Sequence, residues 1–192
     1  MIESLSRYYY NRGLQEARAR QIGAAAQSLA KAASYDSGNI HAWNLAGLCY
    51  YRLGKYKTAE YCWTQSLQHR HEGNAAANYQ LDVSKNLEET RPYFSQLASF
   101  CEEGKYRQAA AVLDQEICSR LGPGADLLNY LGVLLVLDRK IHAAVKCWRT
   151  VLSMDTTNGT AGPYLAAMEN RLSYRLLIWK EWLWQRISRQ KE

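Results

Sequence analysis

The stretch that decides the fold runs from Ile40 to Gly73 and reads IHAWNLAGLCYYRLGKYKTAEYCWTQSLQHRHEG. Its first half and its second half each suit a helix, and Gly54 supplies a turn between them. Gly47 and Ala59 are small, as close crossing of two helices requires, and the bulky Trp63 fills the space around such a crossing. The stretch therefore predicts a pair of antiparallel helices.

The spacing of these residues resembles the tetratricopeptide repeat, a helix-turn-helix unit with the pattern W-x2-L-G-x2-Y, then A-x3-F, then P. The residues that match the pattern or stand at its positions are Trp43, Ala46, Gly47, Tyr50, Ala59 and Trp63. The departures are Ala46 in place of Leu, Trp63 in place of Phe and His71 in place of the closing Pro. The resemblance implies an all-α fold of stacked hairpins.

The neighbouring segments repeat the same frame with weaker matches. The matching positions hold Tyr9, Gly13, Ala25 and Leu29 in the first segment, Tyr93, Leu97, Ala109 and Leu113 in the third, and Leu128, Gly132, Ala144 and Trp148 in the fourth. One strong repeat with three weaker ones in register is more specific than a lone amphipathic hairpin.

The sequence also repeats with a second, longer period. A shift of 85 residues pairs Gly47 with Gly132 and Trp63 with Trp148, and it carries the segment 74–89 onto 159–174. The chain is therefore interpreted as two copies of a unit, each a pair of repeats followed by one extra helix.

These patterns predict one array over residues 1–192, in the form of antiparallel hairpins stacked into a right-handed superhelix, or α-solenoid. The repeats are expected near 6–39, 40–73, 90–123 and 125–158, with an extra helix at 74–89 and a capping helix at 160–190. Pro92 and Pro163 are expected at helix starts, and Gly122-Pro123-Gly124 at a joint between repeats.

The charge excludes one class of partner. The formal charge of +6 lies at the ends of the chain, because residues 21–170 carry 14 basic and 14 acidic side chains. A nucleic-acid-binding protein more often has a basic stripe along its body, so no nucleic acid is expected. No signal peptide and no membrane-spanning apolar run is visible, so a cytoplasmic location is expected.

The sequence offers no catalytic or metal site. The five cysteines form no CxxC pair and are interpreted as reduced core thiols, and His69 and His71 point to different sides of a helix. The adjacent acidic pairs diverge on a helix, and no Gly-rich phosphate loop is present. We therefore expect no cofactor, no metal and no enzymatic activity.

By resemblance, the first helix of each repeat lines a concave face that binds a protein or a peptide. The positions that generally face this groove in the family hold Arg7, Tyr10, His41, Asn44, Tyr51 and Arg52 in the first two repeats, and the extra helix adds Asn78, Asp82 and Lys85. Amide, aromatic and arginine side chains suit an extended peptide, since amides bond its backbone and rings cover its side chains.

The end of the chain is rich in tryptophan and arginine. Leu172, Leu176, Trp179, Leu183 and Ile187 share one arc of a helix, which suits a cap on the array. Trp182, Trp184, Arg175 and Arg186 lie outside that arc. They suit contact with an anionic membrane surface, an acidic partner or a second copy of the chain.

The sequence thus predicts a non-enzymatic scaffold or adaptor that binds a protein or peptide partner on its concave face. The alternative is a membrane-surface or self-association module that acts through the C-terminal helix. A homodimer remains open, and peripheral membrane contact is the less favoured of the two alternatives.

Overall fold

The structure, a computed structural model, describes residues 2–70 and 72–170, and all of its regular elements there are helical. The first four helices form two hairpins: α1 (Ile2–Arg18), α2 (Ile22–Tyr35), α3 (Ile40–Leu53) and α4 (Tyr56–His69). A long helix, α5 (Ala76–Glu102), follows. The return helix is made of α6 (Tyr106–Val112), a π-helical stretch (Leu113–Cys118) and α7 (Ser119–Leu121). The chain then forms α8 (Ala125–Leu137), α9 (Ile141–Met154) and α10 (Ala161–Glu169). The predicted all-α class with sequential hairpins is confirmed.

Four helix-to-helix turns share one backbone form. Each places a residue in the left-handed region one position before the N-cap of the next helix: Arg20 (φ 57°), Gly54 (φ 88°), Gly104 (φ 68°) and Arg139 (φ 64°). These four residues stand at the same place in the four predicted repeats. Glycine adopts this conformation without strain, whereas in the two arginines the Cβ atom makes the left-handed backbone less favourable.

The core of two hairpins is built around tryptophan. Trp63 and Trp148 are each only 1% exposed, as the sequence predicts. A Cβ atom on Gly47 would overlap the Trp63 indole, and one on Gly132 would lie 2.6 Å from Cε2 of Trp148. Because real Cβ atoms do not come so close, glycine is what lets each indole lie flat between the crossing helices.

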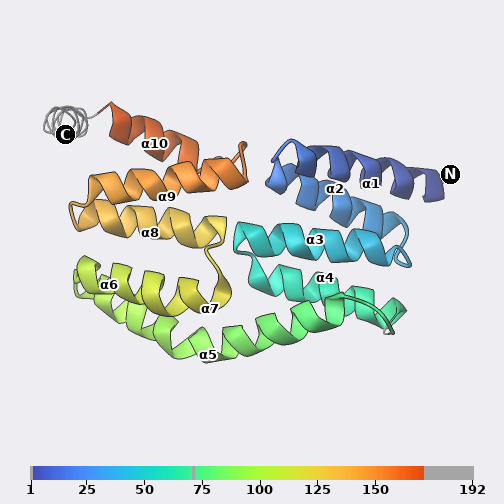
Figure 1. Ribbon diagram of the computed structural model, residues 1–192, viewed down its shortest axis with the longest axis horizontal. Helices are drawn as coiled ribbons and strands as arrows, with labels where there is room; N and C mark the ends of the chain where they lie inside the picture. The colour runs from blue at the N-terminus through green and yellow to red at the C-terminus, as the bar shows by residue number, and fades with distance from the viewer. Residues whose placement is uncertain (1, 71, 171–192) are drawn as a thin grey trace, which may run out of the picture.

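The expected break before the third repeat is wrong. The extra helix predicted at 74–89 and the helix predicted to start near Pro92 are one continuous helix, α5, with Pro92 inside it. Proline removes one backbone hydrogen bond and bends a helix without always ending it, and α5 is visibly bent near its middle (Figure 1). Thr90, which is fully buried beside the proline, donates its hydroxyl to the carbonyl of Asn86 (2.8 Å). Because of the bend, the two parts of α5 can pack against different helices.

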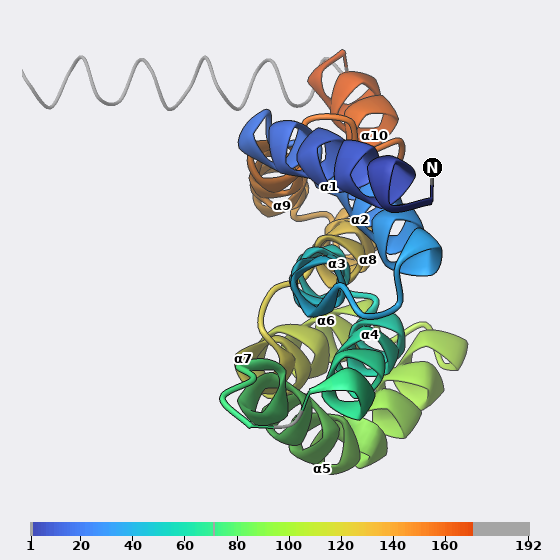
Figure 2. The same cartoon turned by 90° about the vertical axis from the view of Figure 1, so that its right-hand side faces the viewer.

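The long helix joins two stacks of hairpins. Its first part packs against α4 and its second part against α6 and the π-helical stretch. As a result, α1–α4 and α8–α10 lie side by side above it (Figure 1). In the view turned by 90°, α1 and α10 are at one end of the molecule and α5 is at the other (Figure 2).

Loops hold the two stacks together. The hydroxyl of Tyr56 donates to the carbonyl of Gly122 (3.0 Å), and the backbone N–H of Thr156 donates to the carbonyl of Arg20 (2.9 Å). A Cβ on Gly124 would lie 2.6 Å from Cα of Gly54, so the two backbones touch there. The Gly122-Pro123-Gly124 joint is therefore also an interface between the stacks.

The described part of the chain ends within the predicted capping helix. Pro163 lies in the first turn of α10, as expected, and the helix runs to Glu169. The tail residues of the alternative hypothesis, Arg175, Trp182, Trp184 and Arg186, lie outside the described residues. None of the described helices combines the length and the apolar character that crossing a membrane requires.

Candidate functional site

The residues predicted for a concave face fall into two groups. Six of them are exposed and available to a partner: Arg7, His41, Arg52, Asn78, Asp82 and Lys85. Lys85 forms an exposed ion pair with Glu89 (3.9 Å) one turn along α5. The other three, Tyr10, Asn44 and Tyr51, are half-buried and contribute to packing.

Asn44 has a structural role that the sequence did not reveal. Its side-chain N–H donates to Oδ1 of Asn74 (2.8 Å), and that oxygen also accepts the backbone N–H of Ala76 (3.1 Å). Asn44 thereby ties α3 to the start of α5. Its own Oδ1 is buried, so the predicted bond from this amide to a peptide backbone is not available in this structure.

Tyr51 and Tyr10 are also engaged inside the protein. The Tyr51 ring packs edge-to-face on Tyr56, with ring centres 5.4 Å apart, and its hydroxyl lies against Gly122. Burial raises the pKa of Tyr51, and the nearby charge of Asp82 raises it further. Tyr10 packs against buried clusters that are formed mainly by α2 and α3.

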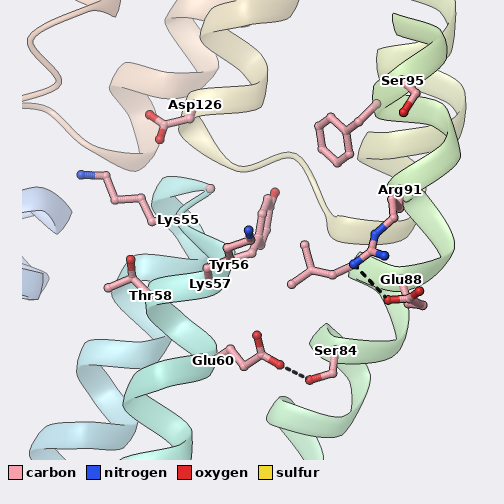
Figure 3. A pocket seen from close by; sticks show the side chains of 13 residues that line it. Lys55, Tyr56, Lys57, Thr58, Glu60, Ser84, Glu88, Arg91, Ser95 and Asp126 are labelled. Carbon is pink, nitrogen blue, oxygen red and sulfur yellow. Dashed lines mark hydrogen bonds and ion pairs between the residues drawn. The ribbon is translucent and has the colours of Figure 1, made fainter. Parts of the chain in front are cut away.

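The structure instead shows a cleft where the two stacks meet α5 (Figure 3). The first turn of α4 and the turn before it form one wall, the middle of α5 forms the opposite wall, and Asp126 at the start of α8 closes one end. Its volume is about 930 Å³, which is within the size range of sites that bind ligands. The bend of α5 and the return of the chain through α8 produce this cleft together.

The cleft has an apolar strip along α5. Leu87 is half-buried, and Phe94 is 37% exposed. Below them lies Tyr56, which is 6% exposed. Burial raises the pKa of Tyr56 far above its usual value, so its hydroxyl stays neutral and serves as the donor to Gly122. This hydrogen bond links the α4 wall of the cleft to the loop before α8.

Charged side chains surround this strip, and two of the three acidic ones have bonding partners. Glu60 on α4 accepts the hydroxyl of Ser84 on α5, which holds the two walls together, and Glu88 pairs with Arg91 (3.6 Å). Burial raises the pKa of Asp126, and the positive charge of Lys55 partly offsets that effect.

The basic side chain of Lys57 differs from these. It is exposed, lines the cleft from α4, and makes no hydrogen bond or ion pair with any residue in the described ranges. The cleft thus combines an exposed aromatic ring with three basic and three acidic side chains.

Sequence reasoning missed the cleft because its walls come from distant segments. The turn Gly54-Lys55-Tyr56 is visible in the repeat pattern, but Phe94 and Arg91 were expected in a separate helix of another repeat. The one available signal was the pair Leu87 and Phe94, apolar residues seven positions apart that share a helix face only if the helix is continuous. Among the described residues, no group of three or more potential metal ligands comes together.

No protein-family model and no curated protein matches this sequence significantly. Among solved structures, the chain is similar to the P58(IPK) TPR domain, with 14% identity and a TM-score of 0.48, over 90% of this chain and 57% of that one. It is also similar to MamA 41-end from Desulfovibrio magneticus RS-1, with 15% identity and a TM-score of 0.37, over 97% of both chains. A further match, the MamA RS-1 ArsTM double mutant, has 14% identity and a TM-score of 0.37 over 97% of this chain and 96% of that one. The chain spans just over half of the P58(IPK) domain. The chain thus matches tetratricopeptide-repeat structures over most of its length, and these likenesses concern the fold alone.

Proposed function

We propose that this chain is a non-enzymatic scaffold that binds a segment of a protein partner, and that the cleft between α4, α5 and α8 receives that segment. The observation that carries the proposal is the exposed Phe94 ring in a cleft of about 930 Å³. An apolar surface that is rimmed by polar groups and held on rigid elements is typical of a protein-interaction site.

Hydrogen bonds that link the walls of the cleft to each other and to the loop before α8 support binding. The Glu60–Ser84 hydrogen bond links α4 to α5, and the Tyr56–Gly122 hydrogen bond links α4 to the loop before α8. A site that is already ordered loses little conformational freedom on binding, so more of the contact energy contributes to affinity.

The cleft also suits a peptide better than a small metabolite. It is an open depression with side chains of both charge signs along its rim, and its apolar strip follows one face of α5. The exposed members of the predicted concave face, such as His41 and Arg52, remain a prediction for a second contact with the same partner.

The experiment is a selection of displayed random peptides on the immobilised full-length chain, followed by affinity measurements on the selected peptides. Phe94→Ser should weaken binding about tenfold, since part of a buried aromatic ring is worth one to two kcal/mol. The matched control is Leu81→Ser, because Leu81 lies on the same helix, is 73% exposed and does not line the cleft. Selected peptides that bind both variants equally well would place the binding site elsewhere.

A further inference from the structure

We propose that the two stacks, α1–α4 and α8–α10, separate at the end that lies away from α5, called the outer end below, while they stay joined nearer to α5. The structure shows the closed form of this arrangement (Figure 1). The opening goes beyond the proposed function, and only its effect on the cleft rests on that function.

The hydrophobic cores of the two stacks are separate at the outer end. In the described part of the chain, one buried cluster there comes from α1–α4 and includes Ile22, and another comes from α8–α10 and includes Val151. The cluster that both stacks share lies nearer to α5, and Tyr56 of α4 and Leu127 of α8 both belong to it. Because burial of apolar surface is the main force that holds packed helices together, the stacks are joined most firmly at this shared cluster.

The hydrogen bonds between the stacks at the outer end converge on one backbone carbonyl. The carbonyl of Arg20, in the turn between α1 and α2, accepts the backbone N–H of Thr156 (2.9 Å) and also its hydroxyl (3.3 Å). Arg20 and Thr156 are both exposed, so water can replace these bonds when the stacks separate. A hydrogen bond that water can replace contributes little net free energy, so this contact should open more easily than the shared core.

A polar cavity lies between the two stacks. Its volume is about 420 Å³, and it is lined by Gln27 of α2, Asp126 of α8, and Asp155 and Asn158 of the loop after α9. Polar groups that face such a cavity keep their hydrogen bonds to water when it widens. Separation of the stacks at the outer end therefore exposes a surface that already suits water.

The buried carboxylate of Asp155 favours the open form. Asp155 is 3% exposed and makes no ion pair within the described ranges. Its Oδ1 accepts the N–H and the hydroxyl of Thr157, whereas Oδ2 makes no hydrogen bond to any described residue and lies beside Gly23 at the start of α2. The helix start offers only a partial positive charge, and a buried charge without a charged partner costs free energy. Separation would let water reach Oδ2, which offsets part of the lost contact.

Opening would also change the cleft, because the cavity and the cleft share two residues. Lys55, in the turn before α4, and Asp126, at the start of α8, line both of them and belong to different stacks (Figure 3). Separation of the stacks would move Asp126 relative to Lys55 and alter that end of the cleft. A segment bound in the cleft should therefore favour one of the two forms.

The test measures distances between spin labels in the full-length chain by pulsed electron paramagnetic resonance. One pair, Ala19 with Ser153, joins the two stacks near their outer contact, and the control pair, Ala19 with Arg52, lies within the first stack. All three positions are exposed, and an introduced keto amino acid carries each label, so the native cysteines stay unlabelled. We expect two distances for the pair between the stacks and a single distance for the control pair.

Variants of the outer contact assign the longer distance to opening. Thr156→Pro removes both hydrogen bonds to Arg20 and should raise the fraction of the longer distance about tenfold, and Thr156→Val removes only the hydroxyl and should raise it about twofold. The control is Thr160→Val, the same substitution at an exposed position of the same loop, which should leave the fraction unchanged. A single, unchanged distance in the parent and in both Thr156 variants would overturn the proposal.

A disulfide provides the closed reference. Gly23→Cys combined with Asp155→Cys places two thiols across the outer contact, since a Cβ at position 23 would lie 3.3 Å from Oδ2 of Asp155. Oxidation should abolish the longer distance and change the affinity of peptides selected on the chain about threefold or more, and reduction should reverse both effects. The two single-cysteine variants are the controls.

The outcomes separate this inference from the proposed function. If oxidation abolishes the longer distance but leaves peptide affinity unchanged, the stacks open and the effect on the cleft is wrong. If Phe94→Ser changes the binding of no selected peptide, the cleft is not the binding site, while the distances still decide whether the stacks open.

Discussion

The second halves of the two copies of the repeated unit, residues 40–89 and 125–170, share an internal framework and differ on their surfaces. Each copy stacks a buried tryptophan on a tyrosine of the following helix, Trp63 on Tyr79 with ring centres 5.6 Å apart and Trp148 on Tyr164 at 5.3 Å. The framework therefore repeats at the level of ring contacts.

Asparagine pairs repeat in the same way. Asn44 donates to Asn74 in the first copy (2.8 Å), and Asn129 donates to Asn158 in the second (3.2 Å). The accepting asparagine also accepts the backbone N–H of the first residue of the next helix in each copy, Ala76 and Ala161 respectively. A polar contact that recurs at equivalent places in both copies is a feature of the fold, which explains why Asn44 is not free to bind a peptide.

The wall of the cleft that α4 supplies has a different composition at the equivalent positions of the second copy. The positions of Tyr56, Lys57 and Glu60 are held in the second copy by Ile141, His142 and Val145. The difference teaches that the positions around the buried tryptophan are kept in both copies, whereas the first turn of α4 differs from that of α9.

The largest expected effect is on the shared tryptophans. Trp63→Ala and Trp148→Ala should each lower the free energy of unfolding by about 3–5 kcal/mol, because each leaves a large cavity in the core. Urea denaturation followed by circular dichroism measures this change. If the free energy of unfolding falls by less than about 1 kcal/mol at either position, the two tryptophans do not have equivalent roles in the core.

A milder change at the same positions should separate them. Nε1 of Trp63 donates to the carbonyl of Asn44 (3.3 Å), whereas Nε1 of Trp148 is buried without an acceptor in the described part of the chain. Substitution by Phe should therefore cost about 1 kcal/mol more at Trp63 than at Trp148.

The third prediction concerns the turns, where the expected change in stability has opposite signs in the two copies. Gly54→Ala should destabilise the protein by about 1 kcal/mol or more, because Gly54 has a left-handed backbone and an added Cβ would lie 3.2 Å from Cβ of Asp126. Arg139→Gly should stabilise it by up to about 1 kcal/mol, because glycine removes the strain of the same backbone form. Thermal unfolding of both variants gives the comparison, and shifts of the same sign would contradict it.

The smallest effect is a difference in the reactivity of equivalent thiols. Burial raises the pKa of Cys62 to about 12 and that of Cys147 to about 11, and Cys62 is only 2% exposed whereas Cys147 is half-buried. Because the thiolate is the reactive form, both should react slowly at about pH 8, with Cys147 the faster of the two, and both should speed up as pH rises. Mass spectrometry of iodoacetamide labelling, native and in urea, measures the order. In urea the difference should vanish, and a faster native Cys62 would contradict the burial seen in the structure.

Much of the fold could be predicted because each repeat has the same kinds of residue at the same positions in the sequence. Small residues at helix crossings, aromatic residues beside them and a turn residue before the second helix recur in register, so the pairs Gly47–Trp63 and Gly132–Trp148 were predicted from spacing. The break at Pro92 was predicted wrongly because a proline in a helix interior bends or ends it depending on what packs on either side, and that depends on distant segments.

The sequence by itself determined the all-α class, the register of the hairpins and the burial of the two tryptophans, because helical periodicity and residue size act over one or two turns. The tertiary structure alone decided that α5 is continuous, that the two stacks lie side by side, and that Asn44 bonds inside the protein while Lys57 faces an open cleft. These features depend on contacts between residues far apart in the chain, such as Tyr56 with Gly122 and Arg20 with Thr156, and such contacts leave no periodic pattern in the sequence.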